Sequence, residues 1–287
     1  IGLILGAMFL VFIVIAAVKI SQVRERKKLQ SLLKSGKMNT LFMDQTNVID
    51  FSKLTIIKEL GSGGSGATVV LAQHLNMHYA VKLVKQTKTE KKAQNNTNEK
   101  LLQDNNALYE ELQTICSCKN PNVIPIYSIV DTSNYFGFVM EYCDNGSLKQ
   151  YLVARGSSLK MLDRINIMLQ IARGMECIHA QNITHHDLKT DNILVSGITI
   201  KIADFGFAKV SGKPFTGGTG YYIAPEKVTL TERISEKVDV FSYAMIMFEV
   251  MTNTAPFPNC NVAIANAIAK NGIRPVLPAD FNHVDWQ

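Results

Sequence analysis

The chain has 287 residues, of which 47% are hydrophobic and 19% are charged, and its net charge is +6. This length allows one domain of roughly 250 residues and a short additional segment. Residues 19–37 alone carry a net charge of +6, so the rest of the chain is neutral and we expect no nucleic-acid partner.

Residues 1–18 carry no charge and are almost entirely apolar. As a helix they would span about 27 Å, which is enough to cross the hydrocarbon core of a bilayer. A buried helix would show a polar face, and a signal peptide would show a basic start and a cleavage site. We therefore expect a single transmembrane helix, in a protein whose own N-terminus precedes Ile1.

A basic segment follows this apolar stretch directly. Its position predicts a cytoplasmic location for everything that follows, by the positive-inside rule. We expect residues 19–50 to form a juxtamembrane linker whose cations can also bind anionic lipid. Gly2 and Gly6 form a GxxxG pair, so a homodimer through the transmembrane helix is a further hypothesis.

From Asp50 onward, strand-like runs surround a glycine-rich segment. Residues 54–57 and 69–71 are rich in β-branched side chains, and they flank the run 61–66, which is composed of glycine and serine. Ala80-Val81-Lys82 follows, with its lysine sixteen residues after Gly66. A glycine turn between two strands lets the backbone lie close to phosphates, whereas a dinucleotide-binding turn would precede a helix. A flexible linker would not predict the lysine.

Two helices and one strand are predicted further along. A helix over residues 108–116 precedes the break at Asn120-Pro121-Asn122 and contains Glu110 and Glu111, which point about 100° apart. The run Phe138–Cys143 predicts a buried strand. A helix over residues 161–180 is predicted from apolar positions at helical spacing, which are Ile165, Met168, Ala172 and Met175.

The densest group of polar residues is His185-His186-Asp187-Leu188-Lys189-Thr190-Asp191-Asn192, which Asp204-Phe205-Gly206 follows. Together they supply a base for a hydroxyl, a cation for a phosphate and two oxygen ligands for magnesium, the set that phosphoryl transfer requires. A zinc site on the two histidines is disfavoured, because adjacent residues of an extended loop point to opposite faces.

The five cysteines include no CxxC pair, which excludes a disulfide framework and is typical of a reduced, cytosolic environment. Cys116 and Cys118 lack a second pair of metal ligands. We interpret them as small buried thiols at a helix end rather than as half of a metal site.

In this order the motifs resemble those of protein kinases, and the resemblance covers residues 54 to about 275. It implies an α+β, two-lobed kinase fold after the transmembrane helix. Residues 51–141 would form an N-terminal lobe with a five-stranded sheet and one helix, αC. Residues 142–287 would form a mainly helical lobe that is incomplete at its C-terminus.

The resemblance also implies roles for individual residues. Asp187 would accept the proton of the substrate hydroxyl, Lys189 would contact the γ-phosphate of ATP, and Asn192 and Asp204 would hold Mg²⁺ or Mn²⁺. Lys82 would contact the α- and β-phosphates and pair with Glu111 of αC, with Glu110 as the alternative. The other residues implied around ATP are Gly61, Gly63, Gly66, Thr68, Ala80, Met140, Glu141, Cys143 and Leu194.

Several of these implied contacts are specific enough to check. Met140 would be the gatekeeper, and backbone groups of Glu141 and Cys143 would bind the adenine edge. Thr219 would bond the catalytic aspartate, Asp239 would bond the backbone of the catalytic loop (residues 185–192), and Phe205 would pack inward.

Two positions depart from the family pattern. Thr68 stands where the family usually has valine, and it is also β-branched. His186 replaces an arginine that pairs with a phosphate on the activation loop, so we expect that activation does not depend on a phosphate clamped at this position.

Lys189, two residues after Asp187, is the serine/threonine pattern, and the whole resembles the tyrosine-kinase-like group of serine/threonine kinases. The resemblance implies a membrane-anchored, ATP-dependent serine/threonine kinase with a cytoplasmic catalytic domain and protein substrates. Two alternatives stay open: a nucleotide-binding pseudokinase scaffold, and a dual-specificity or tyrosine kinase.

Overall fold

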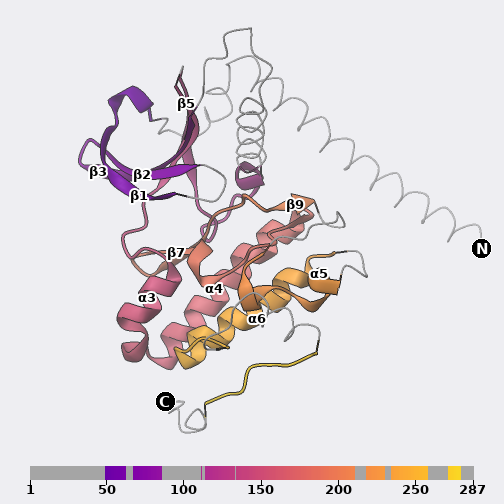
Figure 1. Cartoon of the computed structure of the whole chain (residues 1–287). Helices are drawn as coiled ribbons and strands as arrows, with labels where there is room; N and C mark the ends of the chain where they lie inside the picture. Colours follow the sequence, from indigo (N-terminus) through magenta and orange to yellow (C-terminus); the bar gives the residue numbers. More distant parts are fainter. Residues whose placement is uncertain are drawn as a thin grey trace, which may run out of the picture.

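The computed structural model describes residues 49–62, 67–85, 111, 114–132, 134–210, 218–229, 234–257 and 271–278 (Figure 1). The predicted transmembrane helix and nearly all of the basic linker lie outside these residues, so they remain predictions, as do lipid binding and dimerisation. Within the described ranges, no helix has both the length and the apolar character that crossing a membrane requires.

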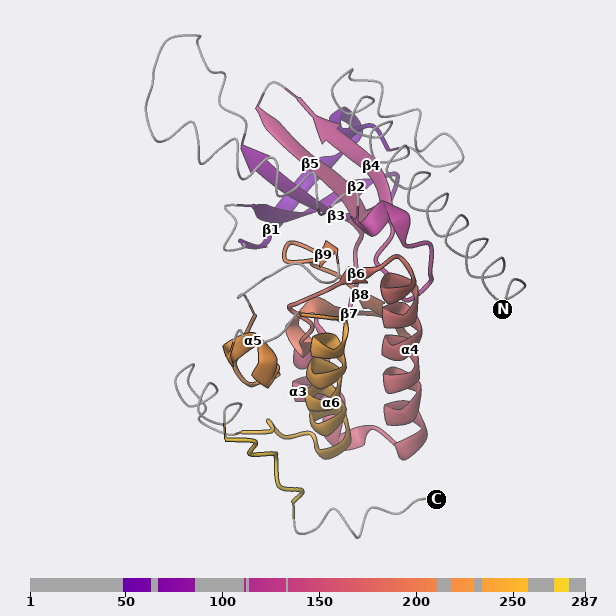
Figure 2. The ribbon, with the colours of Figure 1, turned by 90° about the vertical axis from the view of Figure 1, so that its right-hand side faces the viewer.

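Five of the described strands form one antiparallel sheet in the order β1-β2-β3-β5-β4 (Figure 2). The predicted five-stranded sheet is therefore confirmed. The strands are β1 (Thr55–Ser62), β2 (Thr68–His74), β3 (Met77–Lys85), β4 (Ile126–Asp131) and β5 (Tyr135–Glu141). The strand predicted over 138–143 therefore ends two residues early, and the chain leaves the sheet after Glu141.

The two faces of the sheet have different partners because side chains alternate along each strand. Val70, Val81 and Val139 belong to a small apolar cluster on one face. On the other face, Ala80 is paired with Met140 and Lys82 with Phe138. Ala80, Phe138 and Met140 belong to the main core, so Lys82 lies on the face that is turned toward the rest of the domain.

The helical part lies on the opposite side of the domain from the sheet, which gives the two-lobed arrangement of Figure 2. Its described helices are α3 (Leu148–Arg155), α4 (Met161–Ala180), α5 (Pro225–Thr229) and α6 (Lys237–Thr252). Helix α4 has the predicted bounds. Short 3-10 turns lie at Phe51–Lys53, Gly156–Ser158, Thr190–Asn192 and Gly220–Tyr222.

The buried face of α4 differs in part from the prediction. Met175 is buried, but Ile165 is 42% exposed. The buried stripe runs through Ile167, Ile171 and Ile178, because this face of α4 packs against β8 and α6. All these positions are apolar, so the partners of the helix, rather than its own residues, select the buried face.

Four short strands lie between the sheet and the helices and flank the catalytic loop and Asp204 (Figure 2). Strand β6 (Ile183–Thr184) pairs with β9 (Lys209–Val210), and β7 (Ile193–Ser196) forms a hairpin with β8 (Thr199–Ile202). The catalytic loop joins β6 to β7, and Asp204 follows β8. Phe138, Leu188, Ile202 and Ile246 belong to one continuous core, so this core anchors the loop from both lobes.

Candidate active site

Lys82 of β3 lies between two carboxylates. Its Nζ is 2.7 Å from both carboxylate oxygens of Glu111 and 3.2 Å from Oδ1 of Asp204. Glu111 is helical and only 4% exposed. The predicted pairing with Glu111 is confirmed, and Glu110, the alternative, lies outside the described residues. The contact joins the sheet, the helix that carries Glu111 and the segment after β8.

The charges of this cluster stabilise one another. Desolvation by burial works to lower the pKa of Lys82. The attraction of Glu111 and Asp204 outweighs desolvation, so the pKa of Lys82 lies above its ordinary value. Desolvation also works to raise the pKa of Asp204, and the Lys82 ammonium more than offsets this and holds that pKa low. Lys82 is therefore a cation and Asp204 an anion at neutral pH.

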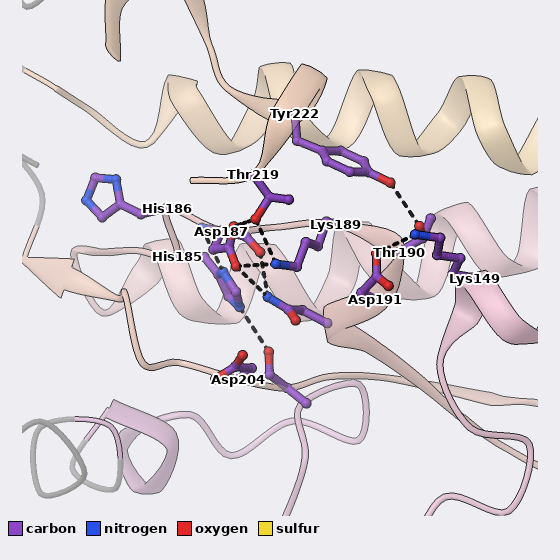
Figure 3. Close-up of polar contacts among 12 residues, drawn as sticks. Lys149, His185, His186, Asp187, Lys189, Thr190, Asp191, Asp204, Thr219 and Tyr222 are labelled. Carbon is purple, nitrogen blue, oxygen red and sulfur yellow. Dashed lines mark hydrogen bonds and ion pairs between the residues drawn. The ribbon is translucent and has the colours of Figure 1, made fainter. Parts of the chain in front are cut away.

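Both carboxylate oxygens of Asp187 accept short hydrogen bonds (Figure 3). Thr219 Oγ1 donates to Oδ1 at 2.7 Å, as predicted. Lys189 Nζ donates to Oδ2 at 2.7 Å and to Thr219 Oγ1 at the same distance. Asn192 Nδ2 donates to Oδ2 at 3.0 Å and to the Asp187 carbonyl at 2.8 Å. Asp187 is thus held in one orientation by three side chains.

Asp239, at the start of α6, holds the backbone of the catalytic loop, as predicted. Its carboxylate accepts from the N–H groups of His185 at 2.8 Å and His186 at 2.9 Å, and it lies 2.9 Å from His179 Nε2. Desolvation works to raise the pKa of this buried carboxyl, but His179 and the two N–H groups hold it below its ordinary value. His186 has φ +69°, a left-handed conformation that these bonds stabilise.

The segment after β8 fixes Asp204. Asp204 has φ +58°, and Phe205 beside it is 1% exposed, which confirms that this ring packs inward. The Phe205 ring centroid lies 5.1 Å from that of His185, whose Nε2 is 3.2 Å from the carbonyl oxygen of Ala203. The Asp204 side chain itself remains 47% exposed, so its carboxylate is open to a ligand.

The donor set fits a hard divalent cation. Asn192 uses its amide nitrogen on Asp187, so its side-chain oxygen is the atom it can offer to a metal. Asp204 adds carboxylate oxygens, and Mg²⁺ and Mn²⁺ both prefer oxygen ligands of this kind. Within the ranges that the structure describes, no cluster of three or more His, Cys, Asp or Glu side chains could hold a metal ion.

Most of the residues that the resemblance implies around the adenine are described by the structure. Ala80, Met140 and Cys143 are buried, and Thr68 and Leu194 are partly buried. The Glu141 N–H donates to the Pro125 carbonyl, and the Cys143 carbonyl accepts from Gly146 N–H. Binding of adenine at this edge would therefore use the Glu141 carbonyl and the Cys143 N–H. Gly61 lies in β1, whereas Gly63 and Gly66 lie outside the described residues.

The cysteine interpretation is correct for one residue and only partly so for the other. Cys118 is buried and Cys116 is partly exposed. Desolvation raises the pKa of Cys118 to about 11 and that of Cys116 to about 12, so both are thiols at neutral pH.

Sequence reasoning missed three polar contacts around the site. Lys201 of β8 bonds Glu141 at 3.0 Å, and Lys227 of α5 donates to the His186 carbonyl at 2.8 Å. Glu249 accepts from Thr190 and Tyr222 beneath the catalytic loop. The available signals were an isolated glutamate in the apolar sequence of α6 and a lysine directly after Ala224-Pro225-Glu226.

Comparison with known proteins gives a consistent result. The sequence model of one family, described as "Protein kinase domain", matches residues 54–283. An RGS domain-containing serine/threonine-protein kinase of Dictyostelium discoideum is 33% identical over 81% of this chain and 20% of its own length. A probable serine/threonine-protein kinase, drkD, of the same organism is 31% identical over 80% of this chain and 17% of its own length.

A third relative has a receptor-like name. A putative serine/threonine-protein kinase/receptor of Acanthamoeba polyphaga mimivirus is 30% identical over 82% of this chain. The match covers 14% of that protein. The chain thus spans one fifth or less of the length of each of these relatives.

Proposed function

Because the chain belongs to the protein kinase domain family, we propose that it is an ATP-dependent protein serine/threonine kinase. The observation that carries this proposal is the arrangement of Asp187, whose two carboxylate oxygens are held by Thr219, Lys189 and Asn192. A carboxylate fixed in this way is suited to orient a substrate hydroxyl and accept its proton.

The other polar residues support the same reaction. ATP would supply the phosphoryl group, and a bound Mg²⁺ or Mn²⁺ would neutralise its charge. Lys82 is a cation for the phosphates, and its bonds to Glu111 and Asp204 keep its Nζ in place. Asn192 and Asp204 would hold the metal. Lys189 adds a second cation 2.7 Å from Asp187, where it would contact the transferred phosphate.

Two observations favour serine and threonine as acceptors. The lysine two residues after Asp187 is the serine/threonine pattern, and the relatives named above are called serine/threonine kinases. The alternatives are a dual-specificity or tyrosine kinase, and a pseudokinase that binds nucleotide without transfer. The presence of Lys82, Asp187, Asn192 and Asp204 disfavours the pseudokinase.

For the whole protein we propose a single-pass membrane kinase of the tyrosine-kinase-like group with its catalytic domain in the cytoplasm. The apolar residues 1–18 and the basic residues 19–37 support this proposal. Anionic lipid at the basic segment and a homodimer through the apolar helix are the partners proposed besides protein substrates.

A kinase assay with phosphoamino-acid analysis tests the catalytic proposal. The chain is incubated with Mg²⁺, labelled ATP and a generic protein substrate, with the Asp187→Asn variant as the matched control. We expect phosphoserine and phosphothreonine from the wild-type chain and no label from the variant. Phosphotyrosine alone would support the tyrosine-kinase alternative. Nucleotide binding without transfer would support the pseudokinase.

A further inference from the structure

Lys227 is a buried cation that the catalytic scheme above does not use. It lies in the short helix α5, directly after Glu226, and is 5% exposed. Its Nζ donates a 2.8 Å hydrogen bond to the backbone carbonyl of His186. Full burial of a lysine is rare and costs free energy, so its presence beside the catalytic loop calls for a functional explanation.

The peptide groups on either side of His186 are held by different helices. The His186 N–H donates to Asp239 of α6 at 2.9 Å, and the His186 carbonyl accepts from Lys227 of α5. His186 has the left-handed φ of +69°, which is unfavourable for a residue with a side chain. The next residue is Asp187, the proposed base. Lys227 therefore bonds the peptide group that joins His186 to Asp187.

Lys227 also lies beside the turn that carries Thr219. A Cβ placed on Gly218 would be 3.3 Å from Lys227 Nζ and 3.5 Å from the His186 carbonyl oxygen. Thr219, the next residue, donates to Asp187 at 2.7 Å. The ammonium therefore lies at the junction of α5, the catalytic loop and the Gly218–Thr219 turn.

We propose that Lys227 is a positioning residue for phosphoryl transfer, whose ammonium holds the His186 carbonyl and thereby keeps Asp187 and Thr219 in register. This inference rests on the proposed kinase activity. Position 186 carries no arginine here. Lys227 supplies a cation that joins α5 to the catalytic loop, in addition to the bond from Lys189 to Thr219, and neither contact requires a phosphate.

The electrostatic environment supports a role for the charge. Desolvation lowers the pKa of Lys227 to about 8, against the opposing attraction of Asp239, Asp187 and Glu226. Besides these carboxylates, His186, whose carbonyl accepts the bond from Lys227, also carries a titratable ring. The unfolded chain binds more protons than the folded one between about pH 8 and the ordinary lysine pKa, so this group makes stability rise with pH in that window. The charge thus weakens the fold at neutral pH, and a purely structural side chain at this position would be better apolar.

The test compares Lys227→Met with Lys237→Met, the same change at an exposed lysine of α6. We expect Lys227→Met to lower kcat roughly tenfold or more, because small displacements of catalytic groups reduce rates steeply. The KM for ATP should stay within about twofold, since Lys227 is not among the residues proposed to bind nucleotide. The melting temperature at pH 7 should not fall. A kcat equal to that of Lys237→Met would overturn the proposal.

The pH profile of the wild-type chain tests the charge without any substitution. We expect kcat to decline as the pH rises through about 8, and this decline to be absent in Lys227→Met. A wild-type profile that is flat between about pH 7 and 9.5 would overturn the proposal, as would a decline that persists in the variant.

Amide hydrogen exchange separates failure of this inference from failure of the kinase assignment. If the wild-type chain transfers no phosphate, the proposed function is wrong, but exchange still reports on positioning. We expect faster exchange over residues 185–192 and 218–222 in Lys227→Met than in Lys237→Met. Equal exchange in the two variants would show that Lys227 does not position the loop.

Discussion

The ammonium of Lys82 bonds two carboxylates, those of Glu111 and Asp204, on the side of the site where we propose that nucleotide binds. Lys82 is 9% exposed and Glu111 is 4% exposed, so each depends on the other to be charged inside the domain. Asp204 is more exposed and shares the same cation. Removing one member of such a set leaves the others as uncompensated charges, so its contribution is visible in stability as well as in catalysis.

Lys82→Met is expected to abolish phosphate transfer and to lower the free energy of unfolding by about 3 kcal/mol, because Glu111 would remain buried without its partner. Desolvation raises the pKa of Glu111, so the folded variant takes up a proton more readily than the unfolded chain does. The loss should therefore be larger at pH 8 than at pH 5.5 in denaturant titrations.

The double variant Lys82→Met/Glu111→Gln should recover part of the lost stability, because it removes the unpaired carboxylate. Lys58→Met, at an exposed lysine of β1, serves as the control for the substitution itself. A double variant that is no more stable than Lys82→Met would contradict this account.

Thr219→Val should reduce kcat by about 10- to 100-fold while leaving the KM for ATP nearly unchanged. The substitution keeps the shape of the side chain but removes the hydroxyl that bonds both Asp187 and Lys189. Steady-state kinetics at varied ATP measures both parameters. Thr219→Ser retains the hydroxyl and should keep most of the activity, and equal loss in both variants would point to a steric effect instead.

Helices α4 and α6 are the elements that support the catalytic loop. Asp239 near the start of α6 holds two of its N–H groups, and Glu249 near the end of α6 accepts from Thr190. Helix α4 delivers His179 to Asp239 and packs against β8, which precedes Asp204. Both carboxylates of α6 therefore accept hydrogen bonds from the catalytic loop.

Gly174→Ala should destabilise the domain, although the same change in an exposed helix would stabilise it by about 1 kcal/mol. A Cβ at this position of α4 would lie 2.7 Å from both the Asn122 carbonyl oxygen and Ile202 Cδ1. We expect a loss of about 1–3 kcal/mol in denaturant titrations because of overpacking. Glu176→Ala, on the exposed side of α4, should change stability little. A more stable Gly174→Ala variant would show that the contact can relax.

The domain as a whole joins a sheet to a set of helices through one continuous core and one ionic cluster. The core runs from Phe138 of β5 through Ile202 of β8 to Ile246 of α6. The ionic cluster links β3 to the segment after β8 through Lys82 and Asp204. Because groups proposed to bind ATP come from both lobes, ligand binding should stabilise the domain as a unit.

Saturating Mg-ATP is expected to raise the melting temperature, in line with about 2.7 kcal/mol of stabilisation at a ligand concentration 100-fold above Kd. Differential scanning fluorimetry measures the shift. Asp204→Asn should reduce the part of the shift that requires Mg²⁺, and ATP without the metal gives the comparison. No shift at any Mg-ATP concentration would mean that the nucleotide site is not formed.

Most of the polar groups of the site were predictable because their signals are local. Lys82 lies in a strand-like run, and Asp187, Lys189 and Asn192 lie within one short loop. Helical spacing also depends only on neighbouring residues, so the bounds of α4 followed from it. The five-stranded sheet followed instead from the resemblance to protein kinases. These features do not depend on which other segments the chain packs against.

The remaining features needed the packed molecule, because they join segments that are far apart in the chain. The bond from Lys82 to Glu111 spans 29 residues, and it forms because of how the helix that carries Glu111 lies against β3. The buried stripe of α4 was decided by β8 and α6, which left Ile165 exposed. The bond from Lys227 to His186 spans 41 residues, so the position of Lys227 in the sequence does not identify its partner. Adjacent residues therefore predicted the catalytic groups, whereas long-range packing decided which neighbours hold them in place.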